Sequence, residues 1–299
     1  MRSVKDIIDV ISQELGIARE IIEKDYYVTM VMKEFFHDEE GLVFKGGTSL
    51  SKGYHLINRF SEDIDLNYID HDSLNRRKRK EIKYELKDVA DRCGLMISNF
   101  DDTRSNRDFN RYEIEYDKAF PSSGVLKSSV IVEMSYQEKS YPCEKLKVNS
   151  IIGEYLEMKK QGIIINQYDL RSFEVNTQSY LRTFIDKLFA VGDYYLSGVI
   201  SEHSRHLYDL HKILPLVQFD EKFSKLYWQV REERSQIHIC LSARTDKKLS
   251  VLLQEIIVSG VYKPDYDKRT SMLLTDDVPY DATIDSLSVI VRKLNEMNL

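Results

Sequence analysis

The stretch KGGTSLSK (Lys45–Lys52) is followed closely by RFSEDIDL (Arg59–Leu66). The apolar run Leu42–Phe44 before the glycines is typical of a short buried strand, and the glycine pair ends it. A helix is expected from Thr48 to about Leu56, and the pattern of Asp63–Leu66 predicts a second strand. The stretch therefore predicts a strand, a tight turn, a helix and a return strand, on which the rest of the fold depends.

Two aspartates share one face of that second strand. Residues i and i+2 of a strand point to the same side, so Asp63 and Asp65 face one way while Ile64 and Leu66 face a core. Neighbouring carboxylates repel each other unless a cation lies between them. Their oxygens suit a hard divalent metal, typically Mg²⁺ carrying nucleotide phosphates. The alternative is an ordinary surface strand end.

A two-metal site needs a further carboxylate from a neighbouring strand. Glu133 is the candidate, because it is the one charge in the apolar run Val130–Met134. Such a charge is costly unless it is paired or bound to a metal. The alternative for Glu133 is a solvated position on an edge strand.

The double glycine before the helix suits a phosphate group. Gly46 and Gly47 allow backbone N–H groups to approach a phosphate closely, and the helix N-terminus adds its partial positive charge. Ser49 and Ser61 can donate hydroxyl hydrogen bonds to the same phosphates. A double glycine alone is equally typical of a tight turn, but a phosphate cradle followed by Asp-x-Asp on a strand is a much more specific combination.

Composition narrows the class of protein. The 299 residues include 43 Lys and Arg against 49 Asp and Glu, a net charge of −6, and only 12 Gly and 5 Pro. So few turn residues argue against a β-sandwich and favour long helices. An acidic chain is not a uniformly basic nucleic-acid binder, so any RNA contact requires a local patch. The candidate patch is the run Arg76, Arg77, Lys78, Arg79 and Lys80, whose alternative is a solvated helix face.

Three isolated cysteines form no CxxC pair, so neither a disulfide framework nor a zinc site is expected. The N-terminal segment mixes charges into its apolar run and is not a signal peptide. No window is apolar enough for a transmembrane helix. These features predict a cytoplasmic protein without a membrane partner.

The chain divides into two halves of different periodicity. Segments rich in β-branched and aromatic residues predict strands at Leu95–Asn99, Arg111–Tyr116 and Val125–Met134. Helical patterns cover the N-terminus, residues 73–93, and almost the whole chain after about residue 177. We expect an α+β protein: a mixed β-sheet flanked by helices in a domain of residues 1–165, then a helical domain of residues 166–299 that completes the active-site cleft.

The motifs together resemble a known family. GG-(T/S)-x-L followed by DxD is similar to the signature of the DNA polymerase β-like nucleotidyltransferases, and KGGTSLSKGY with RFSEDIDL resembles the AbiEii/AbiGii abortive-infection toxins. Three further stretches are similar to that family in order and rough spacing. They are Ile22–Tyr27 (IEKDYY), Asp186–Ala190 (DKLFA) and Arg205–Leu210 (RHLYDL).

The resemblance implies roles for residues at matching positions. Asp63 and Asp65 are then metal ligands, and Ser61 lies beside the triphosphate. Lys187 contacts the nucleotide phosphates, and Asp209 is a further essential carboxylate. The alternatives are a surface lysine that extends to solvent, and an aspartate that only positions Lys187 or forms an i,i+4 ion pair with Arg205.

We therefore expect a Mg²⁺-dependent nucleotidyltransferase with NTP as substrate, acting as the toxin of a toxin–antitoxin system. The resemblance implies the tRNA 3′ end as acceptor and a separate antitoxin as partner. One alternative is a nucleotidyltransferase with a protein or small-molecule acceptor and no toxin role. Another is a nucleotide-binding module without turnover, which the presence of all three carboxylates disfavours.

Overall fold

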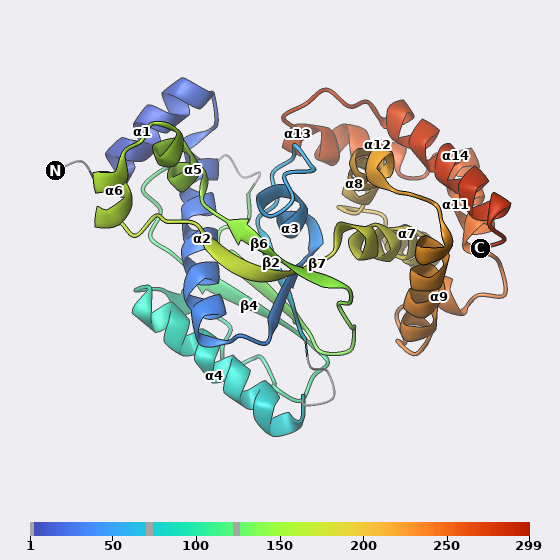
Figure 1. Cartoon of the computed structure of the whole chain (residues 1–299), viewed down its shortest axis with the longest axis horizontal. Coiled ribbons are helices and arrows are strands. Elements are labelled where there is room, and N and C mark those ends of the chain that lie inside the picture. Colours follow the sequence, from blue (N-terminus) through green and yellow to red (C-terminus); the bar gives the residue numbers. More distant parts are fainter. Residues whose placement is uncertain (1–2, 70–73, 122–125) are drawn as a thin grey trace. The chain divides into compact units, whose positions relative to one another are not determined.

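The computed structural model describes residues 3–69, 74–121 and 126–299 (Figure 1). The chain forms two compact units. The first contains Met1–Tyr54 and Ser61–Thr177, and the second contains His55–Phe60 and Gln178–Leu299. The short segment His55–Phe60, which includes the first two residues of the RFSEDIDL stretch, therefore belongs to the second unit.

A seven-stranded mixed sheet forms the centre of the first unit, in the order β3-β4-β5-β2-β1-β7-β6. Strand β2 lies in the middle, antiparallel to β1 and parallel to β5. The strands are β1 (Leu42–Lys45), β2 (Asp63–Tyr68), β3 (Met96–Ile97), β4 (Phe109–Glu115), β5 (Val130–Ser135), β6 (Cys143–Val148) and β7 (Phe173–Gln178).

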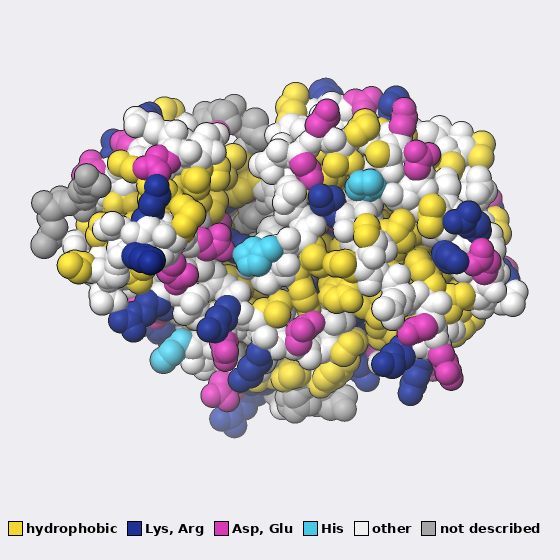
Figure 2. Space-filling view, turned by 45° about the horizontal axis from the view of Figure 1, so that its top comes forward, with side chains coloured by type: hydrophobic (Ala, Val, Ile, Leu, Met, Phe, Trp, Pro, Cys, Tyr) yellow, Lys and Arg dark blue, Asp and Glu magenta, His cyan; other side chains and the backbone are white. Residues whose placement is uncertain are grey.

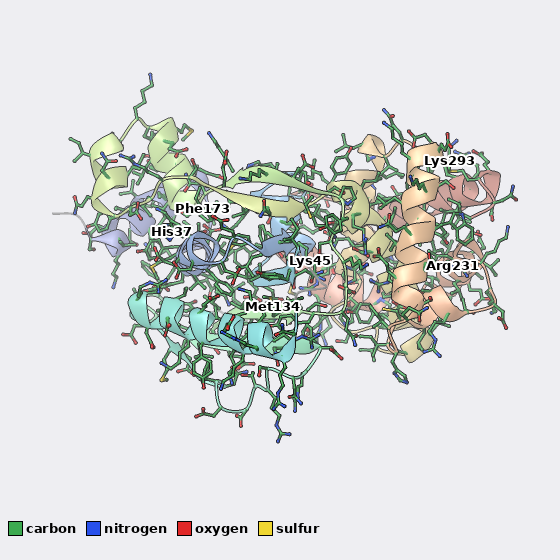
Figure 3. All side chains as sticks on the ribbon, turned by 60° about the horizontal axis from the view of Figure 1, so that its bottom comes forward. His37, Lys45, Met134, Phe173, Arg231 and Lys293 are labelled. Atoms are coloured by element: carbon green, nitrogen blue, oxygen red, sulfur yellow. The ribbon has the colours of Figure 1, made fainter. Side chains whose placement is uncertain are left out.

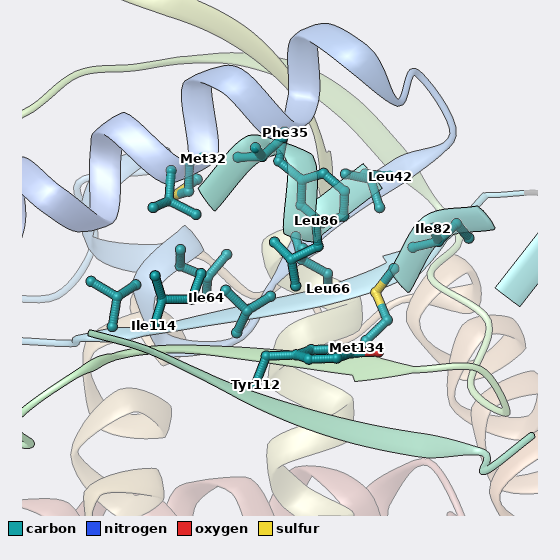
Figure 4. Packing of buried hydrophobic residues seen from close by; sticks show 14 of the residues in the cluster. Met32, Phe35, Leu42, Ile64, Leu66, Ile82, Leu86, Tyr112, Ile114 and Met134 are labelled. Atoms are coloured by element: carbon teal, nitrogen blue, oxygen red, sulfur yellow. The ribbon is translucent and has the colours of Figure 1, made fainter. Parts of the chain in front are cut away.

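Helices α2 (Arg19–Asp38) and α4 (Arg76–Arg92) pack on one face of this sheet. Apolar residues of α2 recur at helical spacing, so Met32 and Phe35 both point toward the sheet (Figure 4). They meet Ile64 and Leu66 of β2, and Met134 of β5 lies beside α4 (Figures 3 and 4). The alternate residues of β2 and β5 consequently point to the opposite face.

A smaller apolar cluster joins three further helices of the first unit: α1 (Val4–Leu15), α5 (Ile151–Met158) and α6 (Gly162–Gln167). Helix α1 begins at a capping box, because the Ser3 hydroxyl accepts from the Asp6 N–H and the Asp6 carboxylate accepts from the Ser3 N–H. It ends at Gly16, whose φ of 69° is left-handed. Serine before a helix and glycine after it are the residue types that favour these two caps.

The second unit is mainly helical. The apolar faces of its helices surround α7, and Phe184 and Leu188 on α7 are fully buried. The longer helices are α7 (Tyr180–Ser197), α8 (Arg205–Ile213), α9 (Glu221–Ser235), α11 (Leu249–Ser259) and α14 (Tyr280–Glu296). Shorter segments are η2 (Leu214–Leu216), α10 (Leu241–Arg244), α12 (Lys263–Asp265), η3 (Tyr266–Thr270) and α13 (Ser271–Leu273).

The expected α+β class is confirmed, with differences in detail. Helix α3 (Gly46–Lys52) is shorter than predicted, because the backbone leaves the helix at Gly53 and His55 takes a left-handed φ of 51°. Strands β6 and β7 were not predicted. Strand β6 carries charged residues on both sides and so lacks the alternation of a half-buried strand. The expected start of the β5 strand at Val125 lies outside the described residues.

Candidate active site

Four charged residues form one row across the face of the sheet that α2 and α4 leave open. Asp65 of β2 pairs in register with Lys45 of β1 on one side and with Glu133 of β5 on the other. Glu133 pairs in turn with Arg111 of β4. Residues opposite each other on adjacent strands share a face, so the two carboxylates are direct neighbours with a cationic residue on each side. Asp63 lies on the same face, two residues before Asp65.

Gly46 and Asp65 approach each other so closely that position 46 has no room for a side chain. A Cβ at Gly46 would lie 1.8 Å from Asp65 Oδ2. Gly46 also has a φ of 74°, a left-handed conformation that other residues adopt only with strain. The first glycine of the pair therefore lets the chain turn from β1 into α3 directly against the Asp65 carboxylate.

The hydroxyl groups of α3 fix this turn to the start of β2. Thr48 Oγ1 lies 2.5 Å from the Asp63 carbonyl oxygen and 2.9 Å from Ser61 Oγ. Ser49 is fully buried and donates to the Gly46 carbonyl oxygen at 2.9 Å. Ser61, which is half-buried, is thus the more accessible of the two predicted phosphate-binding serines.

An ammonium group covers the Asp63 carboxylate. Lys127 Nζ lies 2.8 Å from Asp63 Oδ1 and 2.7 Å from Oδ2. The Glu62 carboxylate accepts from the Lys127 backbone N–H at 3.1 Å and forms an ion pair with Lys24 Nζ at 2.8 Å. Burial lowers the pKa of Lys24, and the attraction of Glu62 opposes that effect.

The donors on this face are of the kind that a divalent cation binds. Asp63, Asp65 and Glu133 supply hard carboxylate oxygens, and Gly46 leaves space beside Asp65 that a Cβ would fill. Across the described ranges, no three His, Cys, Asp or Glu side chains converge into a metal-binding group. Asp63 is instead neutralised by Lys127. The residue types and their common face fit a divalent cation, with Lys127 in contact with one of the expected ligands.

The second unit contains a separate buried charge cluster around Asp209. Arg59 Nε and Nη2 lie 2.7 and 2.8 Å from the two oxygens of the Asp209 carboxylate, and Lys187 Nζ lies 2.7 Å from Oδ2. Burial by itself raises the pKa of Asp209, but the two cations outweigh that effect and hold the pKa well below its usual range. Two cations share one carboxylate, so the three residues carry an excess of one positive charge.

His206 lies beside Lys187 in the same cluster, with Nδ1 3.4 Å from Lys187 Nζ. Burial and the neighbouring Lys187 charge lower the pKa of His206 well below its ordinary value, which favours the neutral ring; with the ring proton on Nε2, Nδ1 accepts from the ammonium group. Burial also lowers the pKa of Lys187, against the attraction of Asp209. Asp209 thus positions Lys187 and Arg59, and its ion pair is not with Arg205.

A family model for "Nucleotidyl transferase AbiEii toxin, Type IV TA system" matches residues 31–286 of the chain. The chain belongs to this AbiEii family. It is therefore a nucleotidyltransferase, the toxin of a type IV toxin–antitoxin system, and the family as a whole uses an NTP and a divalent metal. Membership also implies an antitoxin partner.

Among solved structures, this AbiEii-family chain is similar to MenT4, a nucleotidyltransferase toxin from Mycobacterium tuberculosis. The TM-score is 0.62 at 18% identity, over 97% of this chain and 89% of MenT4. At that identity the likeness shows a shared fold. No curated protein sequence matches the chain significantly. None of the described helices has the length and apolar character needed to cross a membrane.

The basic run of this AbiEii-family protein lies in the first turns of α4, where most of it is engaged within the unit. Lys78 forms an ion pair with Glu39, Arg79 with Asp108 and Arg77 with Glu81. Arg76, Arg77 and Lys80 are exposed, whereas Lys78 and Arg79 are half-buried. On the face drawn in Figure 2, Lys and Arg side chains are interspersed with Asp and Glu.

The structure brings the sequence-predicted residues together in two groups. Gly46, Gly47, Ser49, Ser61, Asp63, Asp65 and Glu133 belong to the first unit, and Lys187 and Asp209 belong to the second. Three contributors were missed: Arg59, Thr48 and Lys127. Arg59 had a usable signal, because it lies directly before the serine–acidic motif. Nothing in the sequence distinguishes Lys127 from a surface lysine.

Proposed function

We propose that this toxin transfers an NMP group from an NTP to the 3′ end of an RNA, with tRNA as the expected acceptor. The observation that supports this most strongly is the carboxylate face of the sheet, where Asp65 and Glu133 are in-register neighbours and Asp63 shares their side. In the transfer, an acceptor hydroxyl oxygen forms a bond to the α-phosphorus, the bond to the β-phosphate oxygen breaks, and pyrophosphate leaves.

Asp63, Asp65 and Glu133 are the residues that would hold Mg²⁺, as a pair of ions. When bound, Mg²⁺ supplies charge neutralisation at the phosphates and a lowered pKa for the acceptor hydroxyl. The turn at Gly46 and Gly47 admits the triphosphate close to the backbone beside Asp65. The Ser61 hydroxyl lies beside Thr48 of α3 and is the proposed phosphate donor. Ser49 stabilises the turn by donating to the Gly46 carbonyl oxygen.

Lys187 is proposed to contact the nucleotide phosphates, and Asp209 to position it. The support is that Arg59 and Lys187 lie together, because both contact Asp209. Neighbouring cationic side chains attract an anion, and a triphosphate is the anion that this enzyme uses. Asp209 does not take a metal in this proposal, because it is fully buried and contacts two cationic side chains, Arg59 and Lys187, that are buried with it.

The exposed Arg76 and Lys80 are proposed to contact the RNA backbone. Such contacts position an acceptor without reading its sequence. NTPs and tRNA are cytoplasmic molecules, so we place the reaction in the cytoplasm, with the antitoxin encoded by a neighbouring gene.

The acceptor is tested by incubating the protein with each α-labelled NTP, Mg²⁺ and either total RNA or total protein. Label is expected in tRNA-sized RNA. Periodate oxidation of the RNA destroys the 3′-terminal diol, and labelling should then be lost. Label in protein, or RNA labelling that survives periodate, would contradict the proposed acceptor.

A further inference from the structure

Asp63 and Lys127 form an ion pair on the carboxylate face in which one ammonium group contacts both carboxylate oxygens. The Lys127 ammonium contacts both oxygens of a carboxylate whose side chain is only 9% exposed. The Lys127 side chain itself is 31% exposed and has a flexible stem. A metal on Asp63 needs the oxygen lone pairs that this ammonium now occupies. Two cations cannot share them at hydrogen-bonding distance without strong repulsion.

The backbone around Lys127 is held independently of the Lys127 side chain. Lys24 is fully buried and donates to the carbonyl oxygens of Lys127 and Ser129, both at 2.7 Å. The third partner of Lys24 is Glu62, which also accepts from the Lys127 N–H. This clamp fixes residues 127–129 directly before β5, the strand that carries Glu133. The fixed main chain places the Lys127 side chain within reach of Asp63.

We propose that Lys127 is a counter-ion of Asp63 that a divalent cation displaces in order to bind there. The proposal rests on the proposed function in taking Asp63 as a metal ligand. Before the metal arrives, Lys127 balances the negative charge at Asp63, so that the two aspartates of β2 lie together without uncompensated repulsion. On metal binding its side chain moves out toward solvent, while the Lys24 clamp keeps the main chain in place.

The test is Mn²⁺ binding to the full chain without nucleotide, measured from the electron paramagnetic resonance signal of free Mn²⁺. Lys127→Met removes the competing charge and keeps the main-chain clamp, so its Mn²⁺ affinity is expected to rise at least about tenfold. Lys127→Arg retains the charge and should bind close to wild type. Lys145→Met, on the exposed strand β6, is the matched control and should leave the affinity unchanged.

A thermal-unfolding series gives a second readout. Mn²⁺ exchanges one cation for another in wild type, so it should raise the Tm of Lys127→Met more than that of wild type. The proposal is overturned if Lys127→Met binds Mn²⁺ no tighter than wild type, including the case in which neither binds.

Asp63→Asn separates this failure from failure of the metal assignment. If Asp63→Asn loses Mn²⁺ binding and Lys127→Met shows no higher Mn²⁺ affinity, Lys127 is not a displaced counter-ion. Asp63 then remains a metal ligand. Undiminished binding in Asp63→Asn rejects Asp63 as a metal ligand and, with it, the counter-ion role of Lys127.

Discussion

The Asp65 carboxylate lies against the α-carbon of Gly46, 1.8 Å from where a Cβ would be. This contact joins the two sequence motifs, because the glycine ends β1 and the aspartate lies on β2. Gly46 therefore has two roles: it allows the backbone turn after β1, and it leaves room for the Asp65 carboxylate.

Gly46→Ala is therefore expected to displace Asp65 and abolish NMP transfer. The left-handed φ of 74° adds about 1–2 kcal/mol of backbone strain to the clash. Transfer assays and chemical unfolding measure the two effects. Gly162→Ala is the control, since a Cβ there meets nothing within 4 Å. Normal transfer by Gly46→Ala would mean that Asp65 does not need its present position.

Asp209 is expected to matter more for stability than Lys187 does. Asp209→Asn removes the buried carboxylate that both Arg59 and Lys187 contact, which should cost about 3–5 kcal/mol in free energy of unfolding. Lys187→Met leaves Asp209 with its two hydrogen bonds from Arg59, so the loss should be clearly smaller. The kcat/KM of Lys187→Met should nevertheless fall at least about tenfold. Urea unfolding and steady-state kinetics measure both quantities.

Asp285→Asn, at an exposed position on α14, is the control for that comparison. Equal stability losses in Asp209→Asn and Lys187→Met would contradict the central place of Asp209 in the cluster. An unchanged kcat/KM in Lys187→Met would show that Lys187 does not contact the nucleotide phosphates and has only a structural role.

Glu85 gives the first unit a dependence on pH. Burial raises the pKa of Glu85 from its ordinary 4.5 to about 7, and the hydrogen bond and negative charge of Glu39 add to this effect, while Lys78 opposes it. The folded state therefore holds the proton more tightly than the unfolded state. The resulting stability is present below pH 4.5 and is lost as the pH rises through about 7.

Glu85→Gln should remove this dependence. The free energy of unfolding of wild type, relative to Glu85→Gln, is expected to decrease between about pH 5 and pH 8 when measured by urea unfolding. Glu115→Gln, at an exposed position on β4, should leave the pH profile of wild type intact. A constant difference between wild type and Glu85→Gln across this range would show that Glu85 does not titrate there.

The basic run predicts different outcomes for its exposed and paired members. The Arg76→Glu, Lys80→Glu double variant should weaken RNA binding and reduce the salt slope by about two, as expected for two lost phosphate contacts. Lys78→Ala should instead lower stability, because Lys78 forms an ion pair with the buried Glu39. An unchanged salt slope in the double variant would remove this run from the RNA contact.

The sequence predicted the strand–turn–helix–strand unit and the shared face of Asp63 and Asp65, because both follow from local periodicity. The in-register pairing of Asp65 with Glu133 depends on how β2 and β5 align, which local pattern does not specify. Lys127 and the Lys24 clamp escaped prediction for the same reason. Lys24 lies 103 residues from its acceptor at Lys127, and only the folded chain brings them together.

Arg59 shows a different limit. Its position beside the motif was visible, yet its partner Asp209 lies 150 residues away, and i,i+4 spacing favoured Arg205 instead. The structure assigns Arg59 and Lys187 to Asp209. Tertiary packing decides whether Asp209 pairs with a neighbour on its own helix or with a residue distant in sequence. The helical pattern alone does not predict that packing.

The most direct test of the carboxylate face is NMP transfer by Asp65→Asn, a variant that preserves the shape against Gly46. Wild type and Asp65→Asn are incubated with labelled NTP, Mg²⁺ and total RNA, and the labelled product is counted. We predict labelled RNA with wild type and none above background with Asp65→Asn, with an unchanged unfolding transition. Full transfer by a folded Asp65→Asn would contradict the assignment of this face as the catalytic site.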